Sequence, residues 1–306
     1  MRRFLYKVVL FGIFFILVNY FYLEVLKRYD WNISKVVESL KLEDENLETI
    51  FFGASLVLDG IDIDYLLEND LQSHNFGIGG ASIRTSYIQL KQYLKKNKKP
   101  KLVVLGVGSL SKSYKSYKRE FFIHPTVEYF YFKKKFVVDN IPMVKFRGQA
   151  LENLKKIVSK DHRDAKLVSG QLKIKKKVPD RTQYKSDLKD KIHISDYEGA
   201  SHLFKMDSIC KLNNIDFIVI EMPGYKKTQN DIPVGPHILK DSIHKITLYN
   251  LNNRELCSTL FDSKNDWLGN SHLNQYGARK LTKYIFENCV KIDSNRNLSQ
   301  YSRLVR

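Results

Sequence analysis

Hydrophobic side chains are concentrated at the amino terminus, in a run that one polar residue interrupts. From Val8 to Leu23 the residues are apolar or aromatic apart from Asn19. Extended to Leu26, the run is long enough to cross the ~30 Å hydrocarbon layer of a bilayer as a helix. No small-residue cleavage site follows, so the pattern predicts an uncleaved signal-anchor rather than a signal peptide. A buried amino-terminal helix is the alternative interpretation.

Basic residues on both sides of the run bear on its orientation. Three of them precede it, while Lys27 and Arg28 follow it. The short basic tail favours a cytoplasmic amino terminus, which would place the main domain outside the cytoplasm, in the periplasm or on the cell surface. We therefore expect residues 1–30 to form a cytoplasmic tail and a transmembrane anchor.

Apolar, strand-like segments alternate with helical segments in the rest of the chain, after a short helix and acidic linker at 31–48. The predicted strands are Thr49–Phe52, a short strand that ends at 75–77, Leu102–Val107 and Ile215–Glu221. The predicted helices are Arg84–Leu94, Ser201–Asn213 and Gln275–Cys289, and Leu56–Leu67 is predicted to be a turn and helix. Strands separated by helices predict an α/β fold, a three-layer α/β/α sandwich with a mostly parallel, flavodoxin-like sheet over residues 49–292. Ligands of such folds meet the carboxyl ends of the strands.

A long insertion rich in Lys and Tyr separates the third and fourth predicted strands, at about 112–198. Within it, Val127–Phe136 and Gly148–Val158 have helical patterns. The insertion could line a sugar-binding groove, act as a lid, or dock on a membrane partner. Residues 293–306 are expected to form a polar tail.

Composition excludes several classes of protein. With 43% hydrophobic residues the chain is not a disordered protein, and its negative mean hydropathy excludes a polytopic membrane protein. The 51 basic and 33 acidic residues give a net charge of +18. Because the lysines are scattered, we interpret them as a solvated surface and expect no nucleic-acid partner. A weaker alternative is a basic surface protein that binds anionic polymers.

Cysteines and histidines give no indication of a metal site. Cys210, Cys257 and Cys289 are too far apart for a zinc or redox motif, so we expect three small, buried apolar residues. The eight histidines form no HExxH motif, and neither a P-loop nor a GxGxxG motif occurs. We expect neither a metal nor another cofactor.

Ser55 lies where a buried strand turns into a helix. Its hydroxyl would project at the carboxyl edge of the sheet, where the helix amino terminus offers free N–H groups to an oxyanion. This position suits a nucleophile, although a helix cap or turn residue is the simpler alternative. Gly80 has no Cβ, so its backbone N–H can approach a substrate oxygen; the alternative is a glycine-rich turn without a ligand.

His272 precedes a polar turn and the last predicted helix. From this loop an imidazole could reach over the sheet edge and accept the proton of Ser55. The surrounding pattern is Ser-His-Leu-Asn, followed by Gly-Ala five residues beyond the histidine. We expect His272 to be a general base, although a lone histidine is more often structural.

Three blocks of sequence together resemble the SGNH (GDSL-type) hydrolases, within the membrane-anchored branch that acylates or deacylates extracellular polysaccharides. They are Gly53–Asp62, Asn75–Ser82 and Ser271–Ala278, in the family's order and spacing. The resemblance covers about residues 49–111 and 205–290. It implies that Ser55 is the nucleophile and His272 the base, and that the amides of Ser55 and Gly80 form the oxyanion hole.

The chain departs from the family pattern at two positions. The aspartate that commonly lies three residues before the histidine is Gly269 here. Asp266 or Asp262 is expected to reach His272 instead, or a backbone carbonyl orients a Ser–His dyad. The family's Gly-x-Asn is Gly106–Gly108 here, which lacks the Asn oxyanion donor and leaves Ser109 as an unsupported helper.

The resemblance implies a membrane-tethered, extracytoplasmic serine esterase or O-acyltransferase. Its expected substrates are acyl esters, acetyl esters first, of a cell-surface or secreted polysaccharide or another acylated glycan. An integral-membrane acyl-donor protein would be the partner of a transferase. The alternative is a catalytically degenerate SGNH-like protein that binds glycan or scaffolds a polysaccharide-assembly complex.

Overall fold

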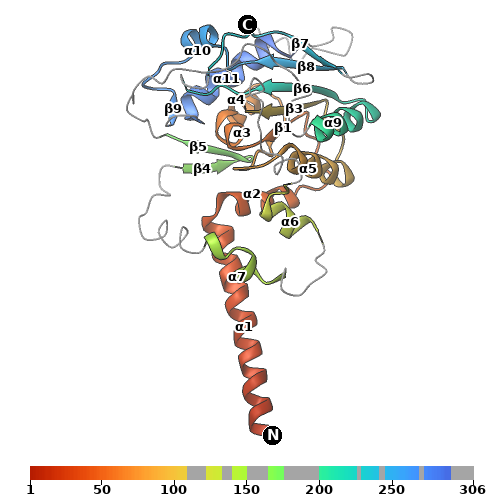
Figure 1. The fold of residues 1–306 in the computed structure, drawn as a ribbon, viewed down its shortest axis with the longest axis vertical. Coiled ribbons are helices and arrows are strands. Elements are labelled where there is room, and N and C mark those ends of the chain that lie inside the picture. The colour runs from red at the N-terminus through yellow and green to blue at the C-terminus, as the bar shows by residue number, and fades with distance from the viewer. Residues whose placement is uncertain are drawn as a thin grey trace. The chain divides into compact units, whose positions relative to one another are not determined.

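The computed structural model describes residues 1–108, 122–132, 140–149, 165–175, 200–225, 229–240, 245–268 and 272–290 (Figure 1). The chain divides into two compact units. The first comprises Met1–Lys41 and Pro125–Arg163, and the second comprises Leu42–His124 and Asp164–Arg306. The predicted insertion is therefore divided between the two units.

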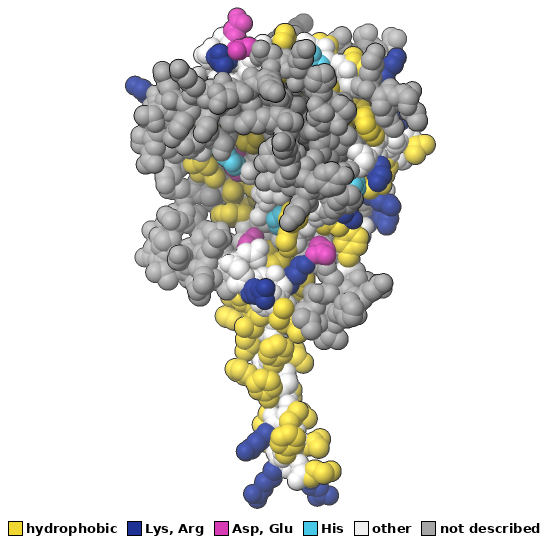
Figure 2. Space-filling model, in the orientation of Figure 1, with side chains coloured by type: hydrophobic (Ala, Val, Ile, Leu, Met, Phe, Trp, Pro, Cys, Tyr) yellow, Lys and Arg dark blue, Asp and Glu magenta, His cyan; other side chains and the backbone are white. Residues whose placement is uncertain are grey.

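The first unit is built around helix α1. Its helices are α1 (Arg2–Tyr29), α2 (Trp31–Leu40), α6 (Pro125–Tyr131) and α7 (Pro142–Lys145). Helix α1 is long and apolar enough to cross a membrane, and Figure 2 shows hydrophobic side chains exposed along it. Among the described residues, it packs against the other helices near its carboxyl end, where Leu26, Ile33 and Phe146 form a small buried core. Asp30 ends α1 and caps α2, because its carboxylate accepts the amide of Ile33 at 3.0 Å.

The second unit contains a six-stranded sheet in the order β2-β1-β3-β6-β8-β7. Its strands are β1 (Thr49–Gly53), β2 (Ser73–Asn75), β3 (Leu102–Val107), β6 (Asp216–Glu221), β7 (His237–Lys240) and β8 (Lys245–Asn250). All neighbours are parallel except β7, which is antiparallel to β8. The mixed α/β class with a mostly parallel sheet, preceded by one apolar helix, is thus confirmed.

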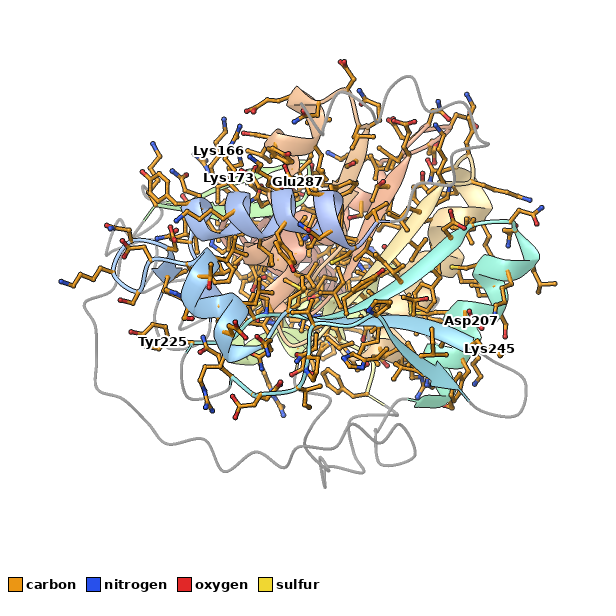
Figure 3. All side chains as sticks on the ribbon, turned by 90° about the horizontal axis from the view of Figure 1, so that it is seen from above. Lys166, Lys173, Asp207, Tyr225, Lys245 and Glu287 are labelled. Carbon is orange, nitrogen blue, oxygen red and sulfur yellow. The ribbon has the colours of Figure 1, made fainter. Side chains whose placement is uncertain are left out.

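Helices cover both faces of this sheet. They are α3 (Ser55–Gly60), α4 (Ile63–Glu68), α5 (Ile83–Lys96), α9 (Ala200–Leu212), α10 (Arg254–Leu260) and α11 (Gln275–Asn288). Successive strand residues point to opposite faces, so Phe51 packs with α3, α4, α10 and α11, whereas Ile50 and Phe52 pack with α5 and α9. In Figure 3, Asp207 of α9 and Glu287 of α11 lie on opposite sides of the sheet.

Several elements differ from the sequence-based expectation. The segment Leu56–Leu67, predicted to be a turn and helix, belongs to two short helices, because the chain is extended at Ile61 and Asp62 before Asp62 caps α4. Strands β7 and β8 were not predicted. The expected helix Val127–Phe136 corresponds to α6, whereas Gly148–Val158 lies almost wholly outside the described residues. All three cysteines are buried, as predicted.

Candidate active site

A tight corner between β1 and α3 places Ser55 at the carboxyl end of a buried strand. Gly53 ends β1 with φ of +150°, and a Cβ there would lie 2.3 Å from the carbonyl oxygen of Gly106 and 2.4 Å from Cγ2 of Val57. The first turn of α3 therefore lies directly on β1 and β3, and only glycine fits at the corner. Ser55 is the first residue of α3, so its amide has no partner within the helix.

Asn75, at the end of β2, fixes this corner from the neighbouring strand. Its side chain is buried; Nδ2 donates to the carbonyl of Val57 at 2.7 Å, and Oδ1 accepts the amide of Gly77 at 2.8 Å. The amide of Ile78 in turn donates to the carbonyl of Gly53 at 3.0 Å. One side chain thus ties α3 to the loop that follows β2.

Gly80 lies in that loop, in a turn closed by a bond of 3.0 Å from the amide of Ala81 to the carbonyl of Ile78. Its φ of +77° is the value that a glycine adopts at the third position of a type II turn. A Cβ at Gly80 would meet no atom within 4 Å, so the backbone conformation rather than crowding requires glycine. Gly80 is exposed, which leaves its backbone open to a ligand.

A two-stranded hairpin carries His272. It pairs β9 (Trp267–Leu268) with β10 (His272–Leu273), with His272 opposite Leu268. The ring of Trp267 packs edge-on against those of Tyr225 and Phe261, with centroids 5.2 and 5.3 Å away, and so anchors the hairpin to the core.

The Asn and Gly of the histidine block have structural roles. Oδ1 of Asn274 accepts the amides of Tyr276 and Gly277 and caps α11. A Cβ at Gly277 would lie 2.4 Å from the carbonyl oxygen of Asp266, so glycine permits the close approach of this helix to the loop.

Ser55 and His272, 217 residues apart in sequence, meet in this structure. Oγ of Ser55 lies 3.4 Å from Nε2 of His272. On the other side of the ring, Nδ1 lies 2.6 Å from Oδ2 of Asp59. A carboxylate at Nδ1 fixes the tautomer with the proton on that nitrogen, so Nε2 is free to accept the serine proton. The three side chains thus form a continuous series of contacts from a serine hydroxyl through an imidazole to a carboxylate.

Asp59 was missed by the sequence interpretation, which sought the acid near the histidine. It lies four residues after Ser55 on α3, so both side chains are on the same face of the helix, one turn apart. The side chain of Asp59 is only 8% exposed, whereas that of His272 is 25% exposed. The i, i+4 spacing from Ser55 was the signal that could have identified it.

Asp266, the predicted acid, has other partners. Its buried carboxylate accepts the amide of Asp262 at 2.7 Å and pairs with the ammonium of Lys280 at 2.6 Å, so it stabilises its own loop and α11. Asp262, the second candidate, accepts the amides of Lys264 and Asn265, and these bonds lower the pKa of its carboxyl. The expectation that Asp266 or Asp262 reaches His272 is therefore wrong, because the carboxylate at Nδ1 of His272 is that of Asp59.

The third block, Gly106–Gly108, has no side chain that can donate a hydrogen bond, and its first glycine allows close packing. Gly106 lies against Val57 and against Met222, whose sulfur would be 2.9 Å from a Cβ at this position. Gly108 ends the described part of this segment and is exposed. Ser109 and residues 269–271 lie outside the described residues.

Part of the insertion supports the α3–α4 corner. The hairpin of β4 (Ala165–Val168) and β5 (Gln171–Ile174) presents Oε1 of Gln171 to the amide of Ile63 at 3.0 Å. Lys173, labelled in Figure 3, pairs with Asp64 and lies 3.6 Å from Oδ1 of Asp62. Burial nevertheless raises the pKa of the Asp62 carboxyl, which Lys173 and Arg279 only partly offset.

No group of three or more His, Cys, Asp or Glu side chains that could hold a metal ion occurs among the described residues. A serine hydroxyl that contacts an imidazole, at the amino terminus of a helix, is an arrangement that can attack an acyl carbonyl.

Comparison of the sequence with models of known protein families gave no match, and comparison with curated proteins gave none either. The case for a function therefore depends on the geometry of Ser55, His272 and Asp59.

Proposed function

We propose that the protein is a serine-dependent acyl-transfer enzyme of the SGNH type, a three-layer α/β/α sandwich of flavodoxin-like topology. The observation that carries the proposal is the continuous contact from Ser55 through His272 to Asp59. In this arrangement Nε2 of a histidine faces a serine hydroxyl and Nδ1 faces a buried carboxylate. Such an arrangement activates the hydroxyl as a nucleophile.

The chemistry follows from these contacts. Oγ of Ser55 attacks the acyl carbonyl carbon while Nε2 of His272 takes its proton, and Asp59 stabilises the resulting imidazolium. The oxyanion of the tetrahedral intermediate is held by the amides of Ser55 and Gly80. When the intermediate collapses, the ester C–O bond breaks and His272 returns the proton to the departing alcohol. The acyl group is then bound to Ser55 as an ester.

The acceptor in the second half-reaction decides the overall activity. Water, deprotonated by His272, regenerates Ser55 and makes the protein an esterase; a sugar hydroxyl makes it an O-acyltransferase. Helix α1, which is long and apolar enough to cross a membrane, supports the membrane-tethered form of the proposal. The short basic tail before it favours an amino terminus in the cytoplasm, and the proposal places the second unit outside the cytoplasm. The proposed substrate is an acylated glycan, in particular an acetylated polysaccharide, and an integral-membrane protein would supply the acyl group to a transferase.

A glycan-binding or scaffolding role is the competing proposal. The argument for this alternative is that two residues of the family pattern are absent, the aspartate before His272 and the Asn of the third block. Asp59 removes the first reason, because a carboxylate faces His272 by another route. The second reason bears on rate, since one oxyanion donor is worth about 10²–10³ in turnover.

The test is covalent labelling of the full-length protein in detergent with a fluorophosphonate, which reacts with activated serines. We expect the wild type to be labelled and Ser55→Ala to be unlabelled. Ser258→Ala is the matched control, since Ser258 is exposed on α10 and its hydroxyl only donates to the carbonyl of Glu255. A folded wild type that never reacts, or equal labelling of Ser55→Ala, would overturn the enzymatic proposal and favour the scaffold.

A further inference from the structure

Helix α7 packs beside α1 within the first unit, at the level where α1 ceases to be exposed. The amide of Met143 donates to Oδ1 of Asn19 at 3.2 Å, and the hydroxyl of Tyr22 donates to the carbonyl of Phe146 at 2.8 Å. Asn19 is the polar residue that interrupts the apolar run. Its Nδ2 donates to the carbonyl of Phe15 at 2.9 Å, so both ends of its amide are bonded.

If α1 spans a bilayer, its length places this contact within the hydrocarbon. A helix rises about 1.5 Å per residue and must cross about 30 Å of hydrocarbon, which takes about 20 residues. If α1 enters the hydrocarbon at Phe4, it leaves at about Leu23. Asn19 and Tyr22 then lie about 6 Å and about 2 Å within the boundary. Entry after Lys7 moves the boundary towards Lys27 and leaves both residues deeper.

The backbone N–H groups of α7 have hydrogen-bond partners within the protein, as a medium without water requires. Pro142 has no N–H group, and the amide of Met143 is bonded to Asn19. The next three amides, through Phe146, donate to the carbonyls of Ile141 and Pro142 at 2.9–3.1 Å. Every backbone N–H from residue 142 to residue 146 is thus satisfied within the unit, which meets the donor part of the requirement for placing backbone in hydrocarbon.

The exposed side chains of α7 are apolar. Met143 and Val144 are 40% and 41% exposed, respectively, whereas Lys145 pairs with Glu128 of α6. The next exposed residue is cationic, Arg147. Two apolar side chains followed by an arginine suit the boundary between acyl chains and anionic head groups.

We propose that α7 is a second membrane contact, an interfacial element that inserts Met143 and Val144 into the outer boundary of the bilayer beside α1. This inference rests on the proposed membrane-spanning role of α1. Two contacts at different angles around α1 fix the rotation of the first unit against the membrane, which a single helix does not. The occupant of this surface is phospholipid, because the surface is continuous with the lipid-facing side of α1.

The test measures the depth of single fluorescent labels on the full-length protein in vesicles of phosphatidylcholine with a minor fraction of phosphatidylglycerol. Met143→Cys and Val144→Cys carry the label in separate variants. Phe14→Cys, in the middle of α1, is the control within the membrane, and Ile238→Cys, 55% exposed on β7, is the control in water. The native thiols are buried with pKa values raised to about 12, so they stay unlabelled at neutral pH.

We expect labels at 143 and 144 to lose fluorescence to a lipid nitroxide near the head group more than to one near the chain end, and little to aqueous iodide. The order of the two nitroxides should reverse at position 14, and iodide should quench position 238. If 143 and 144 respond to iodide as 238 does while 14 responds to lipid, α7 lies in water and this inference alone is overturned. If 14 also responds to iodide, the anchoring role of α1 falls with it.

Discussion

Replacing Asp59 by Asn is the sharpest test of how the site works. The substitution keeps the size of the side chain and removes the negative charge that faces Nδ1 of His272 at 2.6 Å. A side-chain amide at position 59 that turns its N–H₂ towards the ring stabilises the tautomer with the proton on Nε2. That nitrogen then donates towards Ser55, from which it lies 3.4 Å, instead of accepting its proton.

The expected loss can be bounded from the structure. Because the side chain of Asp59 is 8% exposed, its charge is poorly screened by water. A hydrogen bond to a charged group is worth about 1.5–3 kcal/mol, which corresponds to about 10–10² in rate. The wrong tautomer adds to this, and in serine proteases the equivalent change costs about 10⁴ in turnover. We expect acylation of Ser55 to slow by about 10²–10⁴-fold.

The assay is the second-order rate constant for fluorophosphonate labelling, measured beside hydrolysis of an activated acetyl ester. Asp266→Asn is the matched control, because it removes a buried carboxylate from the loop before His272 without touching the imidazole. It should lower the thermal stability through the lost pair with Lys280, while labelling of the folded fraction stays within a few-fold of the wild type.

The opposite pattern would refute this reasoning. If Asp59→Asn unfolds at the wild-type temperature and is labelled at the wild-type rate, the carboxylate has no part in activating Ser55. If Asp266→Asn instead abolishes labelling of a folded protein, the orienting acid was assigned to the wrong residue.

Three further outcomes follow from the packing around the site. Gly53→Ala should destabilise the fold by more than about 4 kcal/mol, since its Cβ would overlap the carbonyl oxygen of Gly106, whereas Gly148→Ala, with open space around it, should change the thermal midpoint little. Asn75→Ala should cost about 1–3 kcal/mol for each buried backbone group that it leaves unpaired, measured by urea unfolding, and a loss below about 0.5 kcal/mol would contradict its role. Burial raises the pKa of the Cys210 thiol from 9.0 to about 12, so the folded state favours the neutral thiol, and this group should lower stability by about 1.4 kcal/mol per pH unit as pH rises from about 9 towards 12. Because the pKa values of Cys257 and Cys289 are raised in the same way, Cys210→Ala should reduce the measured slope by this amount without abolishing it, and an unchanged slope would count against it.

Local pattern was sufficient for much of the fold. Val8–Leu26 predicted the long apolar helix, and short continuous apolar runs predicted the strands β1, β3 and β6. These elements are recognisable because a strand buried on both faces, or a helix long and apolar enough to cross a membrane, appears as a run of consecutive apolar residues. Strands β7 and β8 were missed because polar residues interrupt their short apolar segments, so no continuous apolar run marks them.

The sequence likewise predicted some residues of the candidate site and not others. A strand followed by a tight corner indicated Ser55, and the residues around His272 indicated a loop at the edge of the sheet. The sequence thus determined which chemical groups are available, but the identity of the third group depended on the path of the chain in space. Asp59 faces His272 because the hairpin of β9 and β10 folds over α3, a contact between segments 213 residues apart. The packing of Trp267 and the close approach of Gly277 to Asp266 set the position of the hairpin. Neither contact produces a periodic pattern in the sequence, so only the tertiary structure decides which carboxylate meets His272.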